Sequence, residues 1–321
     1  MTSRSKPEKP WLSVVMPVHD GERWLPLTLE SAAAQDCSGV EFIILDSTSG
    51  DACTAIVSRF ADRLHIRYDH LPELTSWPAK TNLAVERASA GHVTMLHQDD
   101  LWDADRTAAA REAIRAAPDA VLFLNPSRIV DEHGRALGLW RCPLPADRLL
   151  DGRKVAERLL VQNFVAIPAP IVSRRAWLET GGMDEALWYT ADWDLYLKLL
   201  ARGPVFYRNR PSTAFRVHGS SLTVSGSRER PDFRQQMQQV FDRHSHLVPA
   251  SELPRIRRRA NASIAVNCAL AQASAGSTKA LLPALAEVLS LGPAQALAYL
   301  RDSRVLERAL PRLRARLAGA L

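Results

Sequence analysis

Two adjacent acidic residues, Asp99 and Asp100, follow a short apolar run, Val93 to Leu96, in the stretch GHVTMLHQDDLWDADR. An apolar run bounded by a glycine and then by acids is typical of a buried strand that ends at the carboxyl edge of a sheet, where open α/β folds bind ligands. Two carboxylates at such an edge repel each other unless a metal, a base or solvent compensates. The pattern therefore predicts either a cation site or a solvated acidic turn that caps a helix starting near Ala104.

The composition bounds the class of protein. The chain has 321 residues, of which 46% are hydrophobic and 24% charged, values that are ordinary for a globular protein with one or two cores. The formal net charge of +6 comes mainly from arginine and suits anionic ligands such as nucleotides or phospholipid surfaces. The arginines fall outside any readout motif for nucleic acid, so we expect no nucleic-acid partner.

Cysteine usage and the N-terminus indicate a cytoplasmic protein. The four cysteines have no CxxC spacing, which favours reduced thiols over a structural zinc site. They are Cys37, Cys53, Cys142 and Cys268. Residues 1–10, MTSRSKPEKP, lack the apolar core of a signal peptide, and we expect a short disordered lead there. No uncharged apolar stretch reaches the about 18 residues that a membrane-spanning helix needs.

The elements that must position the acidic pair alternate as βα units from Trp11 onward. Apolar runs predict strands, and amphipathic stretches between them predict helices. The expected strands are 12–18, 40–46, 65–68 and 92–96, and the expected helices are 22–34, 51–60 and 79–88. This order predicts an α/β fold with a doubly wound, mostly parallel sheet. PVHDGE stands after the first strand in place of GxGxxG, which argues against an ordinary dinucleotide-binding domain.

Several separated motifs resemble those of the family 2 glycosyltransferases, which have a GT-A fold. The motifs are PVHDGERWLPLTLESAAAQ, ILDSTSGDA, KTNLAVERASAGHVTMLHQDDLW, GGMDEAL and ADWDLYLKL, and they occur in the family's order from about Ser13 to Thr223. The resemblance implies an inverting transfer of a hexosyl or deoxyhexosyl group from a nucleotide diphosphate sugar to an acceptor hydroxyl. It also implies Mn²⁺ or Mg²⁺ as a cofactor.

By this resemblance, the HQD sequence of His97, Gln98 and Asp99 stands where the family usually has DxD. A divalent cation held by carboxylate oxygens neutralises charge on a leaving diphosphate. Asp99 is the predicted direct ligand, and His97 is either a further ligand or a hydrogen-bonded neighbour. Imidazole suits Mn²⁺ better than Mg²⁺. Gln98 and Asp100 are assigned to the donor side, with the alternative that Asp100 fixes Asp99 or the loop.

The resemblance places the donor nucleotide over the first half of the sheet. Pro17 and His19, in a loop expected over Pro17 to Asp20, and Asp46, at the end of strand two, are assigned to base and ribose contacts. Ser47 replaces an acid that the family often has, which leaves uracil, thymine and guanine as alternatives for the base. An Asx-type turn over 46–50 that caps the next helix is the structural interpretation of Asp46, and it is compatible with ligand binding.

Four further residues are assigned to the substrates or metal by resemblance. Lys80 and Asn82 look like the family's basic residue and asparagine near the donor, although we favour a solvated side chain for Lys80. His218 is expected to approach the diphosphate or complete the metal shell. Arg216 is expected to offset charge on the leaving group.

The predicted acceptor side begins at Trp188 and Tyr189, which could stack on a sugar or pack as an aromatic pair at a domain seam. Asp192 matches the second residue of the family's ED motif, which implies that it is the general base, while Ala191 replaces the glutamate. The structural alternative is that Asp192 caps the helix that follows. Asp194 is the second candidate for the base.

From about Ser225 the composition changes to a polar linker followed by helices separated by prolines. We therefore expect a glycosyltransferase domain over 11–224 and a helical C-terminal region over 225–321. The last segment carries leucines on one face and arginines around them, and Pro311 should kink or interrupt it. Such a helix suits an anionic bilayer, or packs on the catalytic domain or on a second subunit. The leucines are 306, 310, 313 and 317, and the arginines are 304, 308, 312, 314 and 316.

These features predict an inverting glycosyltransferase that acts on a saccharide or lipid-linked acceptor in cell-surface polysaccharide or glycolipid synthesis. It is expected in the cytoplasm or at the inner face of the cell membrane. The alternative is a catalytically degenerate member that binds nucleotide or glycan without turnover, suggested by the departures at Ser47, His97 and Ala191. The number of subunits does not follow from the sequence.

Overall fold

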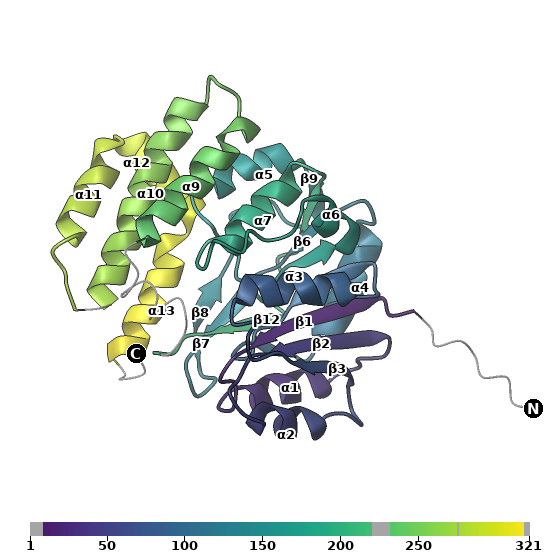
Figure 1. Ribbon diagram of the computed structural model, residues 1–321. Coiled ribbons are helices and arrows are strands. Elements are labelled where there is room, and N and C mark those ends of the chain that lie inside the picture. The colour runs from purple at the N-terminus through teal and green to yellow at the C-terminus, as the bar shows by residue number, and fades with distance from the viewer. Residues whose placement is uncertain (1–8, 220–231, 275, 318–321) are drawn as a thin grey trace, which may run out of the picture.

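The computed structural model describes residues 9–219, 232–274 and 276–317, and it contains an α/β part followed by a group of helices (Figure 1). The main sheet has the strand order β3-β2-β1-β4-β10-β6-β11-β9. Its first four strands are parallel, whereas β10 runs antiparallel to both of its neighbours. The strands are β1 (Leu12–Val18), β2 (Val40–Asp46), β3 (His65–His70), β4 (His92–Met95), β6 (Leu122–Leu124), β9 (Arg148–Leu150), β10 (Ile171–Ser173) and β11 (Val205–Tyr207).

Helices cover both faces of this sheet, because successive side chains of its central strands point to opposite faces and both sets are apolar. Val15 of β1 faces the core under α3, whereas Val14 and Met16 face the core over α1 and α2. Figure 1 shows α3 on one side of β1 and β2, with α1 and α2 on the other. The predicted doubly wound fold class is confirmed. The helices are α1 (Leu25–Ala33), α2 (Ala52–Ser58), α3 (Trp77–Arg87), α4 (Arg106–Ala116), α5 (Gly152–Leu159), α6 (Arg174–Glu179) and α7 (Ala191–Leu200).

A second, four-stranded sheet lies beside the carboxyl end of β4. Its strand order is β5-β12-β7-β8, with β12 antiparallel to β5 and parallel to β7. The acidic pair leads directly into β5, so β12 brings residues that follow position 212 back to the acidic pair. Within it, β5 is Leu101–Trp102, β7 is Ser127–Val130, β8 is Ala136–Trp140 and β12 is Thr213–Arg216.

Three sequence predictions differ from the structure. Strand β1 continues through Val18, so Pro17 is a buried strand residue beside Leu45 and not part of the loop. Helix α3 begins at Trp77, two residues earlier than predicted, because Ser76 accepts a hydrogen bond from the Ala79 amide at 3.4 Å and caps it. Helix α4 begins at Arg106 and has no side-chain cap, so the prediction of an acidic turn capping it is wrong.

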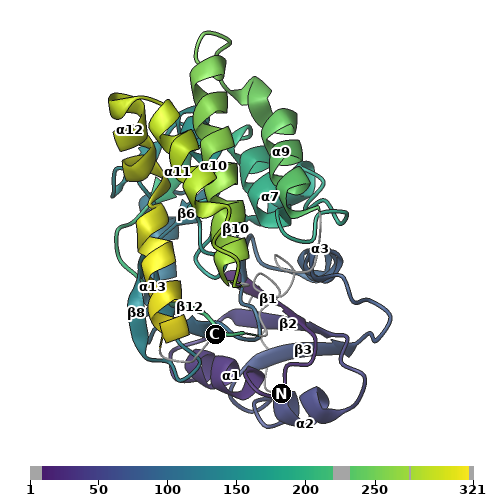
Figure 2. The same ribbon diagram turned by 90° about the vertical axis from the view of Figure 1, so that its left-hand side faces the viewer.

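The C-terminal helices form a separate layer, and the last of them returns to the small sheet (Figure 2). Arg141 pairs with Glu307 at 3.0 Å, and the Pro311 ring would lie 2.8 Å from a Cβ added at Gly138. The predicted packing alternative is therefore observed, and the helix continues through Pro311. The helices are α9 (Phe233–His244), the 3₁₀ helix η1 (Ser245–Leu247), α10 (Leu253–Ser274), α11 (Leu281–Ser290), α12 (Pro293–Ser303) and α13 (Val305–Leu317).

Some predictions concern positions that the structure does not describe. The expected boundary at 224–225 and most of the disordered lead lie outside the described residues, as do the side chains at positions 312, 313, 316 and 317. Among the described helices, none is by itself long and apolar enough to cross a membrane. α11 and α12 reach the required length and hydropathy only together, and they are bent by 117° at the break between them.

Gly152, the first residue of α5, tests the packing of α5 against the end of α7. A Cβ at this position would lie 2.6 Å from the Gly203 carbonyl oxygen and closer still to that of Leu200, and backbone atoms cannot easily move aside. We expect Gly152→Ala to lower the free energy of unfolding by about 1–3 kcal/mol, measured by urea titration. Gly91→Ala, which meets no atom within 4 Å, is the control and should change it by less than about 0.5 kcal/mol. Equal effects of the two substitutions would contradict the packing described.

Candidate active site

The acidic loop after β4 holds Asp99 against a histidine from the other sheet. Asp99 Oδ2 lies 2.9 Å from His218 Nε2, and the Asp99 side chain remains 23% exposed while that of His218 is buried. Burial alone would raise the pKa of Asp99, but the hydrogen bond from His218 holds it below its ordinary value. The structure therefore brings two of the predicted metal ligands together, and leaves one of them accessible.

Asp100 points away from this pair and into the protein. It is 1% exposed, and its Oδ1 accepts a hydrogen bond from the Arg216 amide at 3.0 Å. Burial and the neighbouring charge of Asp99 raise its pKa well above the ordinary value. Its Oδ2 has no hydrogen-bond partner among the described residues. These contacts agree with the alternative that Asp100 fixes the loop; a contact with the donor stays a prediction.

The Arg216 side chain forms hydrogen bonds that hold the backbone of the same loop. Its Nε donates to the Asp99 carbonyl oxygen at 2.8 Å, and its Nη1 donates to the carbonyl oxygens of Asp131 and Glu132, both at 3.1 Å. The guanidinium also stacks over the Trp24 ring at 4.7 Å, and the same ring contacts His218 at 5.2 Å. Arg216 therefore positions the loop. Its contact with a leaving diphosphate remains a prediction. The contacts of Trp24 with Arg216 and His218 were not predicted from the sequence, which indicated only that Trp24 lies near the start of a helix.

His97 does not join the pair formed by Asp99 and His218. Its ring lies edge-on to Trp77 at 5.4 Å between ring centres, and its buried Nε2 has no partner in the described part of the chain. Burial lowers its pKa, which keeps the imidazole neutral. Within the described residues, no group of three or more His, Cys, Asp or Glu side chains is arranged to hold a metal ion. The predicted three-residue set of His97, Asp99 and His218 is thus not assembled by protein atoms alone.

Gln98 joins the acidic loop to the loop after β1. Its amide nitrogen donates to the His19 carbonyl oxygen and its Oε1 accepts from the His19 amide, both at 2.7 Å. The His19 ring is half exposed, and its Nδ1 lies 3.1 Å from the Ser47 hydroxyl. Two residues predicted to bind the donor, His19 and Ser47, therefore lie side by side, and Gln98 holds the backbone of one of them.

Lys80 is buried, so the prediction of a solvated side chain is wrong. It is 1% exposed, and its ammonium group donates to the Val18 carbonyl oxygen and, at 2.8 Å, to the Ser47 hydroxyl. Burial lowers its pKa to about 8. The cause is the placement of α3 over the carboxyl ends of β1 and β2, where main-chain and hydroxyl oxygens replace water around the ammonium group.

Asp46 forms the predicted Asx turn, but the turn does not cap α2, whose N-cap is Asp51 without a side-chain hydrogen bond. Its Oδ1 accepts from the amide and the hydroxyl of Thr48 at 2.8 and 2.6 Å, and its Oδ2 accepts from the Tyr68 hydroxyl at 2.7 Å. The carboxylate is completely buried. These contacts do not test the predicted role of Asp46 in binding the nucleotide. Tyr68 on β3 is a hydrogen-bond partner that was not identified from the sequence.

Helix α3 also contacts the segment that leads into α7. Asn82 Nδ2 donates to the Met183 carbonyl oxygen and its Oδ1 accepts from the Met183 amide, both at 2.9 Å. Trp77 Nε1 donates to the Trp188 carbonyl oxygen at 2.7 Å. Because Trp77 also touches His97, one side chain contacts both the acidic loop and the segment before α7. Trp77 was not identified from the sequence.

Trp188 and Tyr189 pack at a seam with α9, as their structural alternative predicted. Trp188 Nε1 donates to both carboxylate oxygens of Asp232 at 3.0 Å, and the Tyr189 ring lies 4.4 Å from that of Phe233. Both side chains remain partly exposed. Stacking on an acceptor sugar is therefore still a prediction.

Asp192 is buried in the first turn of α7. The helix is preceded by Thr190 at its N-cap, so the interpretation of Asp192 as the cap is wrong. Its Oδ2 accepts a hydrogen bond from Asn163 Nδ2 at 3.1 Å. Burial raises the pKa of this carboxyl group to about 6. A carboxylate of this kind is ionised at neutral pH and is still able to take up a proton.

Asp194, the second candidate for the base, is excluded by its surroundings. It has no exposed surface and lies 2.7 Å from Lys198 Nζ and 2.8 Å from both Arg243 Nη1 and His244 Nε2. Although burial acts to raise its pKa, these hydrogen bonds and charges hold it at about 2. Such a carboxylate accepts no proton near neutral pH, and its role is to fasten α9 to α7.

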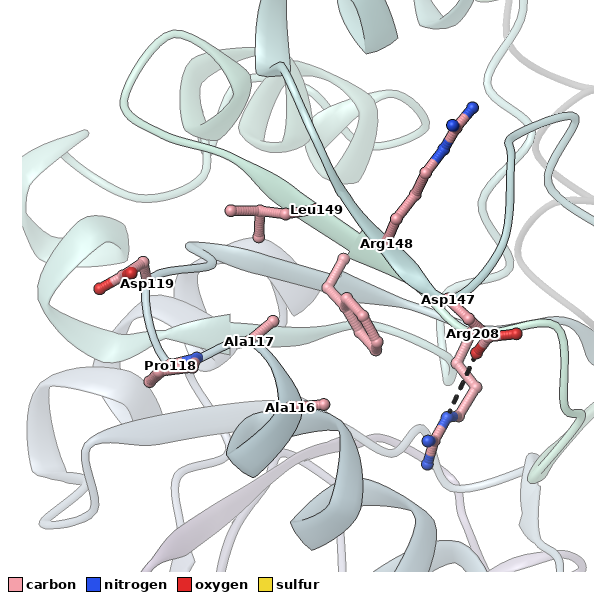
Figure 3. Close-up of a pocket in the computed structure, with 9 residues that line it drawn as sticks. Ala116, Ala117, Pro118, Asp119, Asp147, Arg148, Leu149 and Arg208 are labelled. Carbon is pink, nitrogen blue, oxygen red and sulfur yellow. Dashed lines mark ion pairs between the residues drawn. The ribbon is translucent and has the colours of Figure 1, made fainter.

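A cavity of about 360 Å³ lies elsewhere, between the end of α4 and the edge strand β9 (Figure 3). Arg208 and Asp147, which are 3.5 Å apart, stand at one end of it. None of the predicted site residues lines it. Its lining residues are Ala116, Ala117, Pro118, Asp119, Asp147, Arg148, Leu149, Phe206 and Arg208.

Two glycosyltransferases of known structure share this fold. Staphylococcus aureus TarS superposes with a TM-score of 0.60 at 15% identity, covering 90% of this chain and 51% of that one. The mannosyltransferase PcManGT from Pyrobaculum calidifontis, solved with GDP-Man and Mn²⁺, superposes with a TM-score of 0.54 at 18% identity and covers 97% of this chain and 86% of that one. These similarities confirm the GT-A type of fold.

Sequence comparisons assign the family. Chondroitin synthase of Escherichia coli is 22% identical over 217 residues, which are 67% of this chain and 30% of that protein. The putative teichuronic acid biosynthesis glycosyltransferase TuaG of Bacillus subtilis is 31% identical over 101 residues, 30% of this chain and 39% of that protein. The chain thus spans well under half the length of both. The model for "Glycosyltransferase like family 2" matches residues 13–245, and the chain belongs to glycosyltransferase family 2.

Proposed function

We propose that this protein transfers a sugar, with inversion at its anomeric carbon, from a nucleotide diphosphate sugar to an acceptor hydroxyl. One observation carries the proposal: Trp77 contacts both His97 of the acidic loop and Trp188, four residues before Asp192, so one side chain joins the acidic loop to the segment that leads into Asp192. TarS has been solved with UDP-GlcNAc, in a structure that superposes with a TM-score of 0.54, and PcManGT with GDP-Man.

The proposed acceptor is a saccharide or a lipid-linked saccharide of the cell surface. This part is supported by the names of sequence relatives, which include a teichuronic acid glycosyltransferase, chondroitin synthase and a poly(ribitol-phosphate) β-N-acetylglucosaminyltransferase. The partly exposed Trp188 and Tyr189, which adjoin α7, would form one wall of the acceptor site. A hexosyl or deoxyhexosyl group is the proposed donor sugar.

In the proposed reaction, Asp192 accepts the proton of the acceptor hydroxyl while its oxygen attacks the anomeric carbon. The bond from that carbon to the diphosphate oxygen breaks on the opposite face, and the electron pair leaves with the nucleotide diphosphate. Asn163 holds the carboxylate in place through its 3.1 Å hydrogen bond. The raised pKa of Asp192 favours this step because a base is most effective when its pKa lies near the working pH.

The residues around Asp99 fit a divalent cation shared with the donor. Asp99 supplies an accessible carboxylate and His218 an imidazole nitrogen 2.9 Å away, a donor set that accepts Mn²⁺ more readily than Mg²⁺. When bound, the cation would neutralise charge on the departing diphosphate. Asp100 and Arg216 hold the loop so that the Asp99 side chain faces outward. His19, Asp46, Ser47 and Lys80 are the proposed surroundings of the nucleotide.

Replacing Asp192 tests the base. Asp192→Asn should lower release of nucleotide diphosphate from the correct donor by about 10²–10⁴-fold, because the amide cannot take up the proton. Donor binding, measured as the rise in melting temperature with a panel of UDP- and GDP-sugars, should be unchanged. Glu179→Gln, a half-exposed acid on α6, is the matched control and should keep wild-type turnover. Equal turnover in wild type and Asp192→Asn would refute this assignment. Donor binding without release by either protein would favour a binding protein that has lost catalysis.

The raised pKa of Asp192 predicts two opposite pH effects. Activity should fall about tenfold per pH unit below about pH 6, because the protonated carboxyl group accepts no proton. The folded state binds this proton more tightly than the unfolded chain, so its stabilising effect is lost as pH rises through about 6. At pH 7.5, Asp192→Asn should therefore unfold with about 1–3 kcal/mol more free energy than wild type. An activity profile that is flat from pH 7 to pH 5 would contradict the assignment.

Metal dependence is tested at Asp99. EDTA should abolish turnover, and Mn²⁺ should restore it more fully than Mg²⁺, because an imidazole is one of the proposed ligands. Asp99→Asn should weaken Mn²⁺ binding in the presence of nucleotide diphosphate by about 10–100-fold, measured by calorimetry. Asp69→Asn, on β3, serves as the control and should bind Mn²⁺ as wild type does. Full turnover in EDTA would exclude a catalytic cation.

A further inference from the structure

Helices α11 and α12 expose an unusual number of leucines. Leu282, Leu285 and Leu289 of α11 are 77%, 53% and 66% exposed, and Leu297 of α12 is 70% exposed. We name these four residues the α11–α12 leucine face. Leucines at positions i, i+3 and i+7 lie along one side of a helix, so the three on α11 form a continuous stripe. Figure 1 shows both helices at the outer edge of the molecule, beyond α10.

The sides of α11 and α12 that face the protein are already packed in its core, which leaves the leucine face exposed. Ala284 and Val288 of α11 and Tyr299 of α12 are buried, so each helix already contributes apolar residues to the protein core. The exposed leucines are therefore additional apolar surface that the fold does not use. Residues 281–300 contain a single charged residue, Glu287. Exposed apolar surface of this kind marks a binding face for a partner or a membrane.

The distribution of charge along the chain favours a membrane over a second copy of this protein as the binding partner of the leucine face. Residues 233–317 contain 13 Lys and Arg but five Asp and Glu, whereas residues 1–232 contain 28 basic and 30 acidic residues. The net positive charge of the chain thus resides in its helical C-terminal region. An excess of eight positive charges in the region that carries the apolar stripe suits an anionic surface and opposes a second copy of the same charged region.

Basic side chains border the leucine face itself. Lys279 is exposed just before α11, and Arg258 is exposed and donates to the Ser290 carbonyl oxygen at 2.8 Å, at the end of α11. Arg301, in the last turn of α12, is 67% exposed and pairs with the largely buried Asp302 at 2.8 Å. Beside it lies a cavity of about 200 Å³ whose lining includes four arginines, at positions 158, 255, 259 and 301, and two acids, at positions 157 and 302.

We infer that the α11–α12 leucine face docks on an anionic phospholipid membrane. The leucines enter the boundary between headgroups and acyl chains, and the bordering Lys279, Arg258 and Arg301 contact lipid phosphates. The inference places membrane contact on α11 and α12, whereas the sequence placed it on α13, one side of which packs on β8. It does not depend on the proposed catalytic function.

Vesicle binding tests this inference directly. The full-length protein is mixed with vesicles of phosphatidylcholine alone or of phosphatidylcholine and phosphatidylglycerol in equal parts, and the bound fraction is measured by flotation. Wild type should bind the anionic vesicles, fail to bind the neutral ones, and lose affinity as NaCl is raised. The double variant Leu282→Gln/Leu289→Gln should bind about tenfold or more weakly, because both side chains enter the lipid.

Two controls make the result decisive. The double variant Leu149→Gln/Leu178→Gln removes leucines that are 48% and 42% exposed elsewhere on the surface, and it should bind as wild type does. Circular dichroism and melting temperature should match in all variants, since every substituted side chain is exposed. Light scattering measures the oligomeric state of wild type and variants. Wild type that ignores anionic vesicles, equal binding by both double variants, or an oligomer that only Leu282→Gln/Leu289→Gln dissociates would each overturn the inference.

Discussion

The site depends on a buried guanidinium that joins the two sheets. Arg216 ends β12, and its side chain and amide bond to both residues of the acidic pair and to two carbonyl oxygens after β7. Burying such a cation costs several kcal/mol unless oxygens replace its water, and here the carbonyl oxygens of Asp99, Asp131 and Glu132 do so. Because these bonds fix the backbone at Asp99, they also fix where its carboxylate and His218 meet. The small sheet, through β12, brings Arg216 and His218 to this loop.

The C-terminal helices are part of the same arrangement. Asp194, next but one to the proposed base, is enclosed by Lys198 of its own helix and by Arg243 and His244 of α9. The family match likewise extends through α9 to residue 245, beyond the boundary expected near residue 224. The first of the C-terminal helices thus belongs structurally with the catalytic part, and it sets the orientation of α7.

Local sequence patterns predicted the main sheet well and the site only in part. Continuous apolar runs such as LSVVMPV and VEFIILD mark buried parallel strands, and motif order led to the acidic loop and to Asp192. The small sheet was missed because β5 and β7 are short and pair with a strand far along the chain, which leaves no periodic signal. Lys80 was expected in solvent because burial of a lysine depends on which oxygens the fold brings to it. Trp77 was missed for the same reason, since its two contacts come from distant segments.

Helix α3 has a role that follows from its rigidity. Its eleven residues carry Lys80 against the ends of β1 and β2, while Asn82 bonds to Met183 in the GGMD turn and Trp77 bonds to Trp188 ahead of α7. Because one helix makes all of these contacts, a displacement that a nucleotide imposed near Lys80 in the proposed reaction would reach the segment that leads into α7. Binding of the nucleotide sugar and binding of the acceptor would then be coupled through α3 alone, without any rearrangement of the sheet.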